Sequence, residues 1–275
     1  MNYKAVSLLF CFVLGALSLS SATGPSASPL KAGRRTESYT VDGTDRSYIV
    51  RLPSAIEDPR AKLPLVMLLH GFSGSAASIE LYSGLGSLAD KESFILVTPD
   101  GLGRPAGWNC GFINLGKAGT DDSKFLSGLL DKVCKDFPVD PKRVYIAGHS
   151  NGAMMANVIG GLRSDKVAAI ACMAGVVGVG RTTKQTMPDP KGRISVLHIH
   201  GKDDKVVAYD EQSNALLAGV SAPDAVKWWA DKMGVKASAA KESFQGYQTL
   251  TYADPRTTVA LLTISAWGHE WPTGP

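Results

Sequence analysis

The sequence has no run of basic residues, no low-complexity tract, no internal repeat and no interdomain linker. Its net charge of +4 comes from scattered lysines and arginines without interleaved aromatic residues. This pattern gives no indication of nucleic-acid binding. After residue 22 there is also no apolar run long enough to cross a membrane. A chain of 275 residues with 44% hydrophobic residues can build one sizeable core, so we expect a single domain.

The first 22 residues follow the pattern of an export signal. Lys4 supplies a positive start, residues 5–19 are apolar, and Ser20-Ser21-Ala22 offers small residues for cleavage. The sequence therefore predicts a secreted protein with a signal peptide at 1–22, a flexible leader at 23–35 and one domain at 36–275. We expect a monomer that has no membrane association once the signal is removed.

Cysteine is scarce. Removing the signal removes Cys11 and leaves Cys110, Cys134 and Cys172. An odd count in an exported protein means one disulfide plus a free thiol, or no disulfide. Cys172 lies in an apolar run and is expected to be buried and free. Cys110 and Cys134 are therefore the better candidates for a disulfide.

Short apolar runs alternate with stretches of helical character, which is typical of an α/β fold with a mostly parallel sheet covered on both faces. Asp42-Gly43 separates the first two expected strands, and this pattern predicts an antiparallel hairpin at a sheet edge. Strands are expected at 37–41, 46–52, 65–69, 94–98, 144–147, 167–173, 194–200, 247–252 and 258–265. Helices are expected at 79–90, 123–137, 223–233 and directly after Ser150.

Polar clusters directly follow four of these expected strands. They are His70-Gly71-Phe72, Ser150, the residues 201–204 and Gly268-His269. Because the carboxyl ends of parallel strands meet at one edge of a sheet, we expect the four clusters to lie together. That edge is the predicted functional site.

Gly148-His149-Ser150-Asn151-Gly152 has the Gly-x-Ser-x-Gly pattern between an expected strand and an expected helix. In this context the serine occupies a sharp turn that lifts its hydroxyl away from the sheet and makes it a nucleophile. A Cβ at either glycine would collide with neighbouring backbone. The alternative is a tight structural turn that happens to contain serine.

A serine hydroxyl needs a base, and the base needs an acid to orient it. His149 adjoins the nucleophile and points elsewhere, His70 is expected to be a structural hydrogen bonder, and two further histidines lie within one strand. This leaves His269, in the loop after the last strand, as the base; the alternative is a surface histidine. Asp203 and Asp204 are both candidates for the acid.

Two backbone N–H groups are expected to stabilise negative charge on the substrate carbonyl oxygen. Asn151 follows the nucleophile and Phe72 lies in the loop after the first parallel strand. His198 and His200, followed by two aspartates, raise the alternative of a metal site. No third histidine or cysteine ligand lies near them, so we expect core groups instead.

Three tryptophans fall in loops near the predicted site, where they could hold an aromatic or sugar ring or simply pack under the loops. They are Trp108, Trp267 and Trp271. Of these, Trp108 and Trp271 are the expected substrate contacts.

Together the motifs resemble the secreted polyhydroxybutyrate-depolymerase-like esterases, a family similar to the feruloyl and acetylxylan esterases of carbohydrate esterase family 1. The resemblance runs from about Ser38 to the end and rests on motifs in the same order. They are His70-Gly71-Phe72-x-Gly74, Pro99-Asp100-Gly101, Trp108-Asn109, Asp121-Asp122, the stretch around Ser150, His200-Gly201-x-x-Asp204-x-Val206-Val207 and Gly268-His269-x-Trp271-Pro272.

The resemblance implies an α/β-hydrolase fold with no metal or organic cofactor. It assigns Ser150 as nucleophile, His269 as base and, from the His-Gly-x-x-Asp pattern, Asp204 as acid. This sequence departs from the family at Ala266-Trp267, where relatives have glycines, and lacks a cysteine pair that relatives carry near Val235 and Ala253. Relatives continue into a final helix, so the chain is expected to lack that helix.

We therefore expect a secreted serine carboxylester hydrolase that acts through an acyl-enzyme. The expected substrate is an ester of the polyhydroxyalkanoate type or a feruloyl or acetyl ester of the plant cell wall. Two alternatives are a serine peptidase of the same fold and a non-catalytic binding protein on a hydrolase scaffold.

Overall fold

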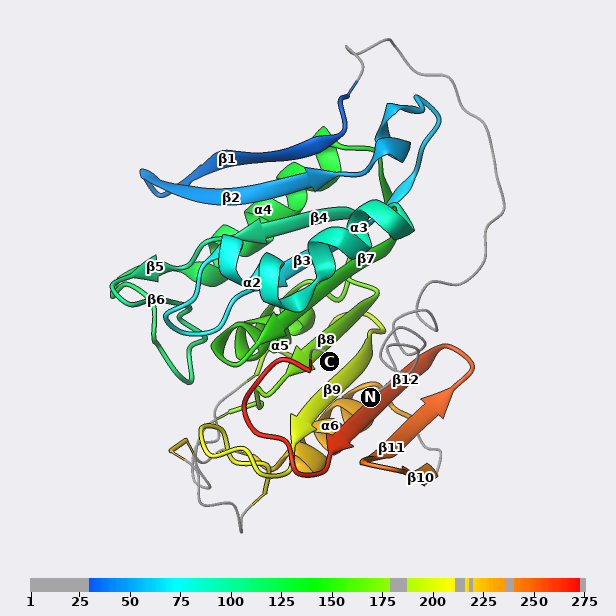
Figure 1. Ribbon diagram of the computed structural model, residues 1–275. Helices are drawn as coiled ribbons and strands as arrows, with labels where there is room; N and C mark the ends of the chain where they lie inside the picture. Colours follow the sequence, from blue (N-terminus) through cyan, green and yellow to red (C-terminus); the bar gives the residue numbers. More distant parts are fainter. Residues whose placement is uncertain (1–29, 179–186, 211–215, 218–219, 236–239, 273–275) are drawn as a thin grey trace.

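The computed structural model describes residues 30–178, 187–210, 216–217, 220–235 and 240–272 (Figure 1). The predicted signal peptide and residues 23–29 of the predicted leader lie outside the described residues. Residues 33–35, which were also assigned to the leader, begin strand β1 (Gly33–Val41) instead. They pair with the end of β2 (Thr44–Leu52). The prediction is wrong there because residues 33–35 are exposed and have no apolar pattern. This end of the strand forms by backbone pairing with β2.

Ten strands form one sheet, and its centre is parallel. Antiparallel pairs extend it at both edges, with β1 and β2 beside β4, and β10 and β11 beside β12 (Figure 1). The predicted mostly parallel α/β sheet is thus confirmed. The six parallel strands are, in spatial order, β4 (Ile95–Pro99), β3 (Leu63–Leu69), β7 (Val139–His149), β8 (Ala169–Met173), β9 (Ser195–Gly201) and β12 (Thr257–Ile264).

Helices cover both faces of the sheet, so its central strands are apolar on both sides. In β3 all seven residues are buried, as expected for a strand between two helical layers. Leu65 and Met67 face a core shared with α4 (Asp122–Asp136), α5 (Asn151–Leu162) and α6 (Ala222–Lys232). Val66 and Leu68 face a smaller core under α2 (Ala76–Ser83) and α3 (Leu85–Glu92). Figure 1 shows α2 and α3 in front of the sheet and the other three helices behind it.

Further differences from the sequence-based expectation concern α2 and β10. The single helix expected at 79–90 is two helices, because Gly84 adopts a left-handed conformation (φ +69°) that ends α2. Strand β10 (Ala240–Phe244) was not expected. All five of its residues are exposed, so it has no apolar face, and it forms by backbone pairing with β11 (Tyr247–Asp254).

The remaining elements are short. A 3₁₀ turn spans Ser54–Glu57, and a small hairpin of β5 (Leu102–Gly103) and β6 (Ala106–Gly107) lies in the long loop before α4. Within the part of the chain that is described, no helix has both the length and the hydropathy needed to cross a membrane.

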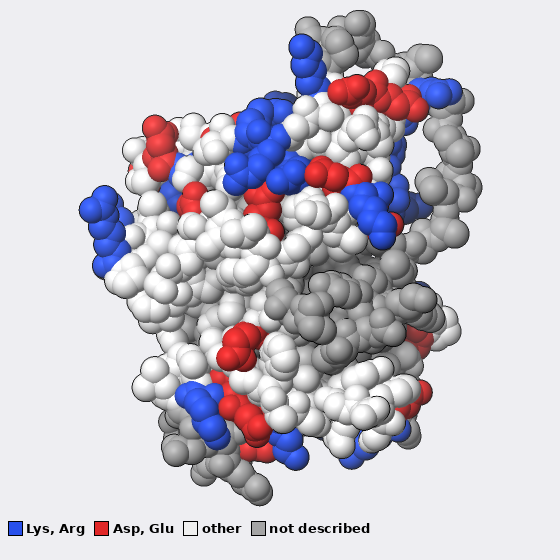
Figure 2. Space-filling model, in the orientation of Figure 1, with Lys and Arg blue, Asp and Glu red and all other residues white. Residues whose placement is uncertain are grey.

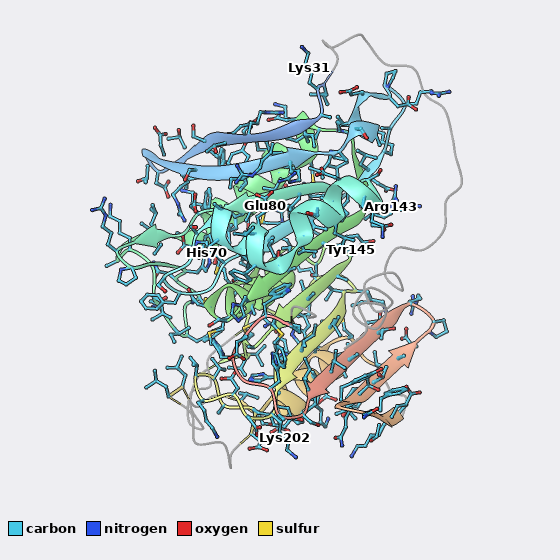
Figure 3. All side chains as sticks on the ribbon, in the orientation of Figure 1. Lys31, His70, Glu80, Arg143, Tyr145 and Lys202 are labelled. Carbon is cyan, nitrogen blue, oxygen red and sulfur yellow. The ribbon has the colours of Figure 1, made fainter. Side chains whose placement is uncertain are left out.

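The carboxyl ends of the parallel strands meet at one edge of the sheet. The arrows of β7, β9 and β12 point toward the same side in Figure 1, and β3 pairs parallel with β7. His70, at the end of β3, and Lys202, just after β9, mark two points along this edge in Figure 3. The four polar clusters singled out in the sequence follow these strands, so they share one edge.

Candidate active site

Ser150 stands at the junction of β7 and α5 with φ +54° and ψ −122°, a conformation that non-glycine residues rarely adopt. Its backbone N–H donates to Met173 O at 2.8 Å. A Cβ on Gly152 would lie 2.3 Å from Leu69 O, and one on Gly148 would lie 2.3 Å from Gly152 O. Both glycines are therefore required for the close packing that holds this turn.

His269 reaches Ser150 from the loop after β12. Its Nε2 lies 2.7 Å from Ser150 Oγ, and its Nδ1 lies 2.7 Å from Asp204 Oδ2. Asp203 is exposed, and its backbone N–H donates to Trp267 O at 3.0 Å. Of the two candidate aspartates, the structure thus brings Asp204 to the imidazole.

The Asp204 carboxylate is buried and surrounded by hydrogen-bond donors. Oδ1 accepts from the Val206 and Val207 N–H groups, each at 2.8 Å, and Oδ2 also lies 3.3 Å from His200 Nε2. Burial by itself would raise the pKa of this carboxyl, but the hydrogen bonds from His200, His269 and the backbone hold the pKa well below its usual range. The carboxylate is therefore ionised.

The remaining histidines have partners that remove them from the role of base. His70 is fully buried; its Nε2 accepts from Gly101 N–H at 2.9 Å and its Nδ1 lies 2.7 Å from Gly71 O. His198 and His200 are also buried, with His198 Nε2 3.1 Å from His200 Nδ1. Among the described residues there is no group of three or more His, Cys, Asp or Glu that could hold a metal ion.

The two residues expected to donate backbone N–H groups to the substrate lie in segments next to Ser150. Asn151 is the first residue of α5, where N–H groups have no carbonyl partner within the helix. The loop of Gly71 and Phe72 abuts Ser150 so closely that a Cβ on Gly71 would be 3.2 Å from Ser150 Cβ. Ser73 N–H donates to Ala106 O at 2.8 Å and Gly74 N–H to Gly71 O at 3.0 Å, which holds this loop in place.

Trp108 is buried and therefore not accessible to a substrate, contrary to the sequence-based expectation. Its side chain is fully buried, with the indole N–H donating to His70 O at 2.8 Å. The Asn151 side chain holds its backbone from the other side, accepting from Trp108 N–H at 2.7 Å and donating to Trp108 O at 3.2 Å. Trp108 therefore connects the loop that carries Phe72 to the first residue of α5, Asn151. The sequence around a loop tryptophan does not distinguish a buried structural side chain from one that is exposed to substrate.

Trp271 and Trp267 are partly exposed beside the His269 loop. The Trp271 ring lies edge-on to the His149 and Tyr82 rings, with centroids 6.2 and 6.3 Å apart. The Trp267 indole N–H donates to Glu270 O at 3.1 Å. Trp271 thus remains available as a substrate contact.

The disulfide expected between Cys110 and Cys134 is absent, since Cys110, Cys134 and Cys172 are all free. The Cys110 thiol is buried under the turn of Ser150, 3.8 Å from Asn151 O, whereas Cys134 lies on α4. The two side chains face different surroundings. The sequence placed one cysteine in a loop and the other in a helix, and this could not show that they do not pair.

The sequence did not predict two residues that contact members of the site, Tyr82 and His200. Tyr82, on α2, hydrogen-bonds His149, and the His149 ring in turn reaches the backbone of His269. His200 contacts Asp204. The spacing of His200 and Asp204 hinted at the second contact, but nothing in the sequence links Tyr82 to the other residues.

With this geometry established, the chain can be compared with known proteins. A family model described as esterase PHB depolymerase matches residues 46–187, a span that contains Ser150. The chain belongs to this family. The resemblance found in the sequence motifs is thus confirmed. Feruloyl esterase B of Piromyces equi is 30% identical over 237 residues, which cover 82% of this chain but only 42% of that protein.

Other matches extend over most of the chain. Feruloyl esterase B of Neurospora crassa is 28% identical over 285 residues, covering 94% of this chain and 93% of that protein. Among solved structures, the acetyl xylan esterase from Aspergillus awamori superposes with a TM-score of 0.67 at 17% identity, covering 87% of this chain and 95% of that one. The structural match confirms the expected α/β-hydrolase fold.

Proposed function

We propose that this chain is a serine carboxylester hydrolase that works through an acyl-enzyme. The proposal rests on one observation: Ser150 Oγ, the His269 ring and the Asp204 carboxylate form a continuous chain of 2.7 Å contacts at the strained turn after β7. This arrangement supplies a nucleophile, a base and an acid in the order that serine catalysis needs.

The proton positions follow from the contacts. A carboxylate can only accept a hydrogen bond, so His269 Nδ1 carries a proton and donates a hydrogen bond to Asp204 Oδ2. In the neutral ring, Nε2 is then free to accept from the Ser150 hydroxyl. Ser150 Oγ attacks the ester carbonyl while its proton passes to Nε2, and the imidazolium returns this proton to the leaving alcohol. Water, deprotonated by the same nitrogen, then attacks the acyl-enzyme; the bond between the acyl carbon and Ser150 Oγ breaks, the acid is released and the imidazolium returns the proton to Oγ.

The tetrahedral intermediate carries negative charge on the former carbonyl oxygen. In our proposal the N–H groups of Phe72 and Asn151 donate to that oxygen, each contributing roughly 3 kcal/mol. Two sets of hydrogen bonds support this: Ser73 N–H donates to Ala106 O, and the Asn151 side chain accepts from Trp108 N–H and donates to Trp108 O. They hold the Phe72 loop and the start of α5 in place before substrate arrives.

The proposed substrates are uncharged esters: polyhydroxyalkanoate-type esters, or feruloyl or acetyl esters of plant cell walls, met after export. Two observations support this. The family is described as PHB depolymerases, and relatives are named feruloyl and acetyl xylan esterases. Between the points that His70 and Lys202 mark, the surface in Figure 2 is white over most of its area, with isolated acidic side chains and a charged cluster near the Lys202 end. Trp271 is the side chain we propose to contact the substrate.

The first prediction tests the chemistry itself. The wild-type chain should hydrolyse short-chain p-nitrophenyl esters, and Ser150→Ala should lose at least about 10⁴-fold in kcat. Ser38→Ala, an exposed serine on β1, is the matched control and should retain wild-type turnover. Turnover of peptide amides but not esters would instead identify a peptidase. A folded wild-type chain that turns over neither would identify a non-catalytic binding protein.

The ester class is distinguished by a panel of substrates. Methyl ferulate, acetylated xylan and polyhydroxybutyrate should be compared by initial rate with the same wild-type preparation and with Ser150→Ala as the blank. A rate on one of these polymers or esters well above that on p-nitrophenyl acetate would assign the substrate.

A further inference from the structure

His149 adjoins Ser150 in the sequence, but its side chain turns toward the loop that carries His269. Its Nε2 lies 2.7 Å from the backbone carbonyl oxygen of His269, and its Nδ1 lies 3.2 Å from the Tyr82 hydroxyl. Tyr82 belongs to α2, and His269 follows β12. One imidazole therefore connects three segments that are far apart in the sequence.

The contacts define which nitrogen of His149 carries the proton. A carbonyl oxygen can only accept, so Nε2 carries the proton and donates to His269 O. In the neutral ring Nδ1 has no proton, and it accepts from the Tyr82 hydroxyl. Both ring nitrogens are thus occupied, and the orientation of the ring is fixed by both partners.

Neighbouring groups keep this imidazole neutral and in place. Its ring centroid lies 5.3 Å from that of His269, and Trp271 packs edge-on at 6.2 Å. Burial lowers the pKa of His149. A neutral ring adds no positive charge next to the imidazolium that forms on His269 during the proposed reaction.

The His269 loop needs such an anchor. His269 lies outside regular secondary structure, and its side chain is 19% exposed. Asp204 holds one ring nitrogen, and Asp203 N–H donates to Trp267 O two residues earlier, but neither bond holds the backbone of His269 itself. A displacement of about 1 Å at a reacting group can cost 100-fold in rate.

We propose that His149 is a positioning residue: its Nε2–H bond to the His269 carbonyl fixes the backbone of the base, and Tyr82 orients His149. This inference rests on the proposed function for its kinetic consequence. The bond itself is a structural claim that can be tested without any substrate.

Two amide substitutions separate the roles of the two ring nitrogens. Glutamine places an N–H donor close to the position of Nε2, whereas asparagine places one close to Nδ1, which faces Tyr82. We expect His149→Gln to keep kcat within about threefold of wild type. His149→Asn and His149→Phe should each lose about tenfold or more in kcat, with KM changed less than about twofold. Tyr82→Phe should show a smaller loss, and Tyr39→Phe on β1 is its control.

A double-mutant comparison shows whether His149 acts through His269. In a His269→Ala background, His149→Phe should cause no further loss of the residual activity, because the group that it positions is gone. Equal losses in both backgrounds, or equal activity of the Gln, Asn and Phe variants, would overturn the proposal.

A substrate-free measurement keeps the two proposals distinguishable. The proton between His269 Nδ1 and Asp204 Oδ2 should give a low-field ¹H NMR resonance in the wild-type chain. It should persist in His149→Gln and broaden or disappear in His149→Asn and His149→Phe. An unchanged resonance in all three variants would refute the positioning role even if no ester is turned over. A wild-type chain without turnover would refute only the proposed function.

Discussion

At the scale of single residues, the ionised Asp204 carboxylate decides which nitrogen of His269 carries the proton. Its Oδ2 lies 2.7 Å from His269 Nδ1, so the neutral ring presents an unprotonated Nε2 to Ser150. An amide at position 204 would offer an N–H to Nδ1 instead. The ring would then carry its proton on Nε2 and could not accept one from the serine.

We therefore expect Asp204→Asn to fold normally but to lose about 10⁴-fold in kcat. Asp203→Asn is the matched control, since the exposed Asp203 side chain makes no contact with His269, and kcat should be unchanged. Steady-state kinetics on a p-nitrophenyl ester, with circular dichroism to verify folding, provide the measurement. A comparable loss in both variants would contradict the assignment of Asp204.

At the scale of elements, the position of the nucleophile depends on the contact between α5 and β3. Gly152, in the first turn of α5, lies against the backbone carbonyls of Leu69 and His70, which a Cβ would approach to 2.3 and 2.4 Å. Backbone atoms of a central strand cannot move aside as the end of a side chain can. The helix can approach the strand this closely only because residue 152 has no side chain.

Gly152→Ala should therefore lower the free energy of unfolding by about 3 kcal/mol or more. Gly160→Ala, on the same helix, is the comparison, because its Cβ would meet side-chain atoms of Ile170 at 2.9 Å and no backbone atom within that distance. Chemical denaturation of both variants measures the difference. An equal loss of stability in the two variants would show that the contact with β3 is not the reason why position 152 requires glycine.

At the scale of the whole molecule, the burial of neutral histidines makes stability depend on pH. Burial lowers the pKa of His70, His149 and His198, each from an ordinary value of 6.5. The unfolded chain therefore binds protons below about pH 6.5 that the folded chain does not bind. The stabilisation is fully present above that pH and is lost progressively as the pH falls.

We expect the free energy of unfolding to decrease between pH 7.5 and pH 5. His198→Gln, which replaces one titrating group with a neutral donor, should reduce the slope of this decrease. The lowered pKa of Asp204 also reduces stability as the pH falls, but its contribution changes only below about pH 5 and so adds little in this window. Denaturant titrations at several pH values measure the slope; an identical slope in the variant would contradict this account.

Local patterns were enough to predict much of the architecture. Continuous apolar runs such as 65–69 predicted buried strands, and the helix expected at 123–137 is present as α4 (Asp122–Asp136). β10 was not predictable, because an exposed edge strand has no apolar period. The break at Gly84 was missed because a glycine inside a helical pattern can be tolerated, and the expected helix held two, Gly84 and Gly86.

For the site, the sequence alone indicated the residue types and the strand ends on which they lie, because parallel strands bring their carboxyl ends to one edge. Only the tertiary structure decided which side chains touch. It buried Trp108 beneath the site, left Cys110 and Cys134 apart, and turned His149 toward the His269 backbone. These outcomes depend on the packing of distant segments within a few ångströms, and no periodicity or spacing along the chain encodes such distances.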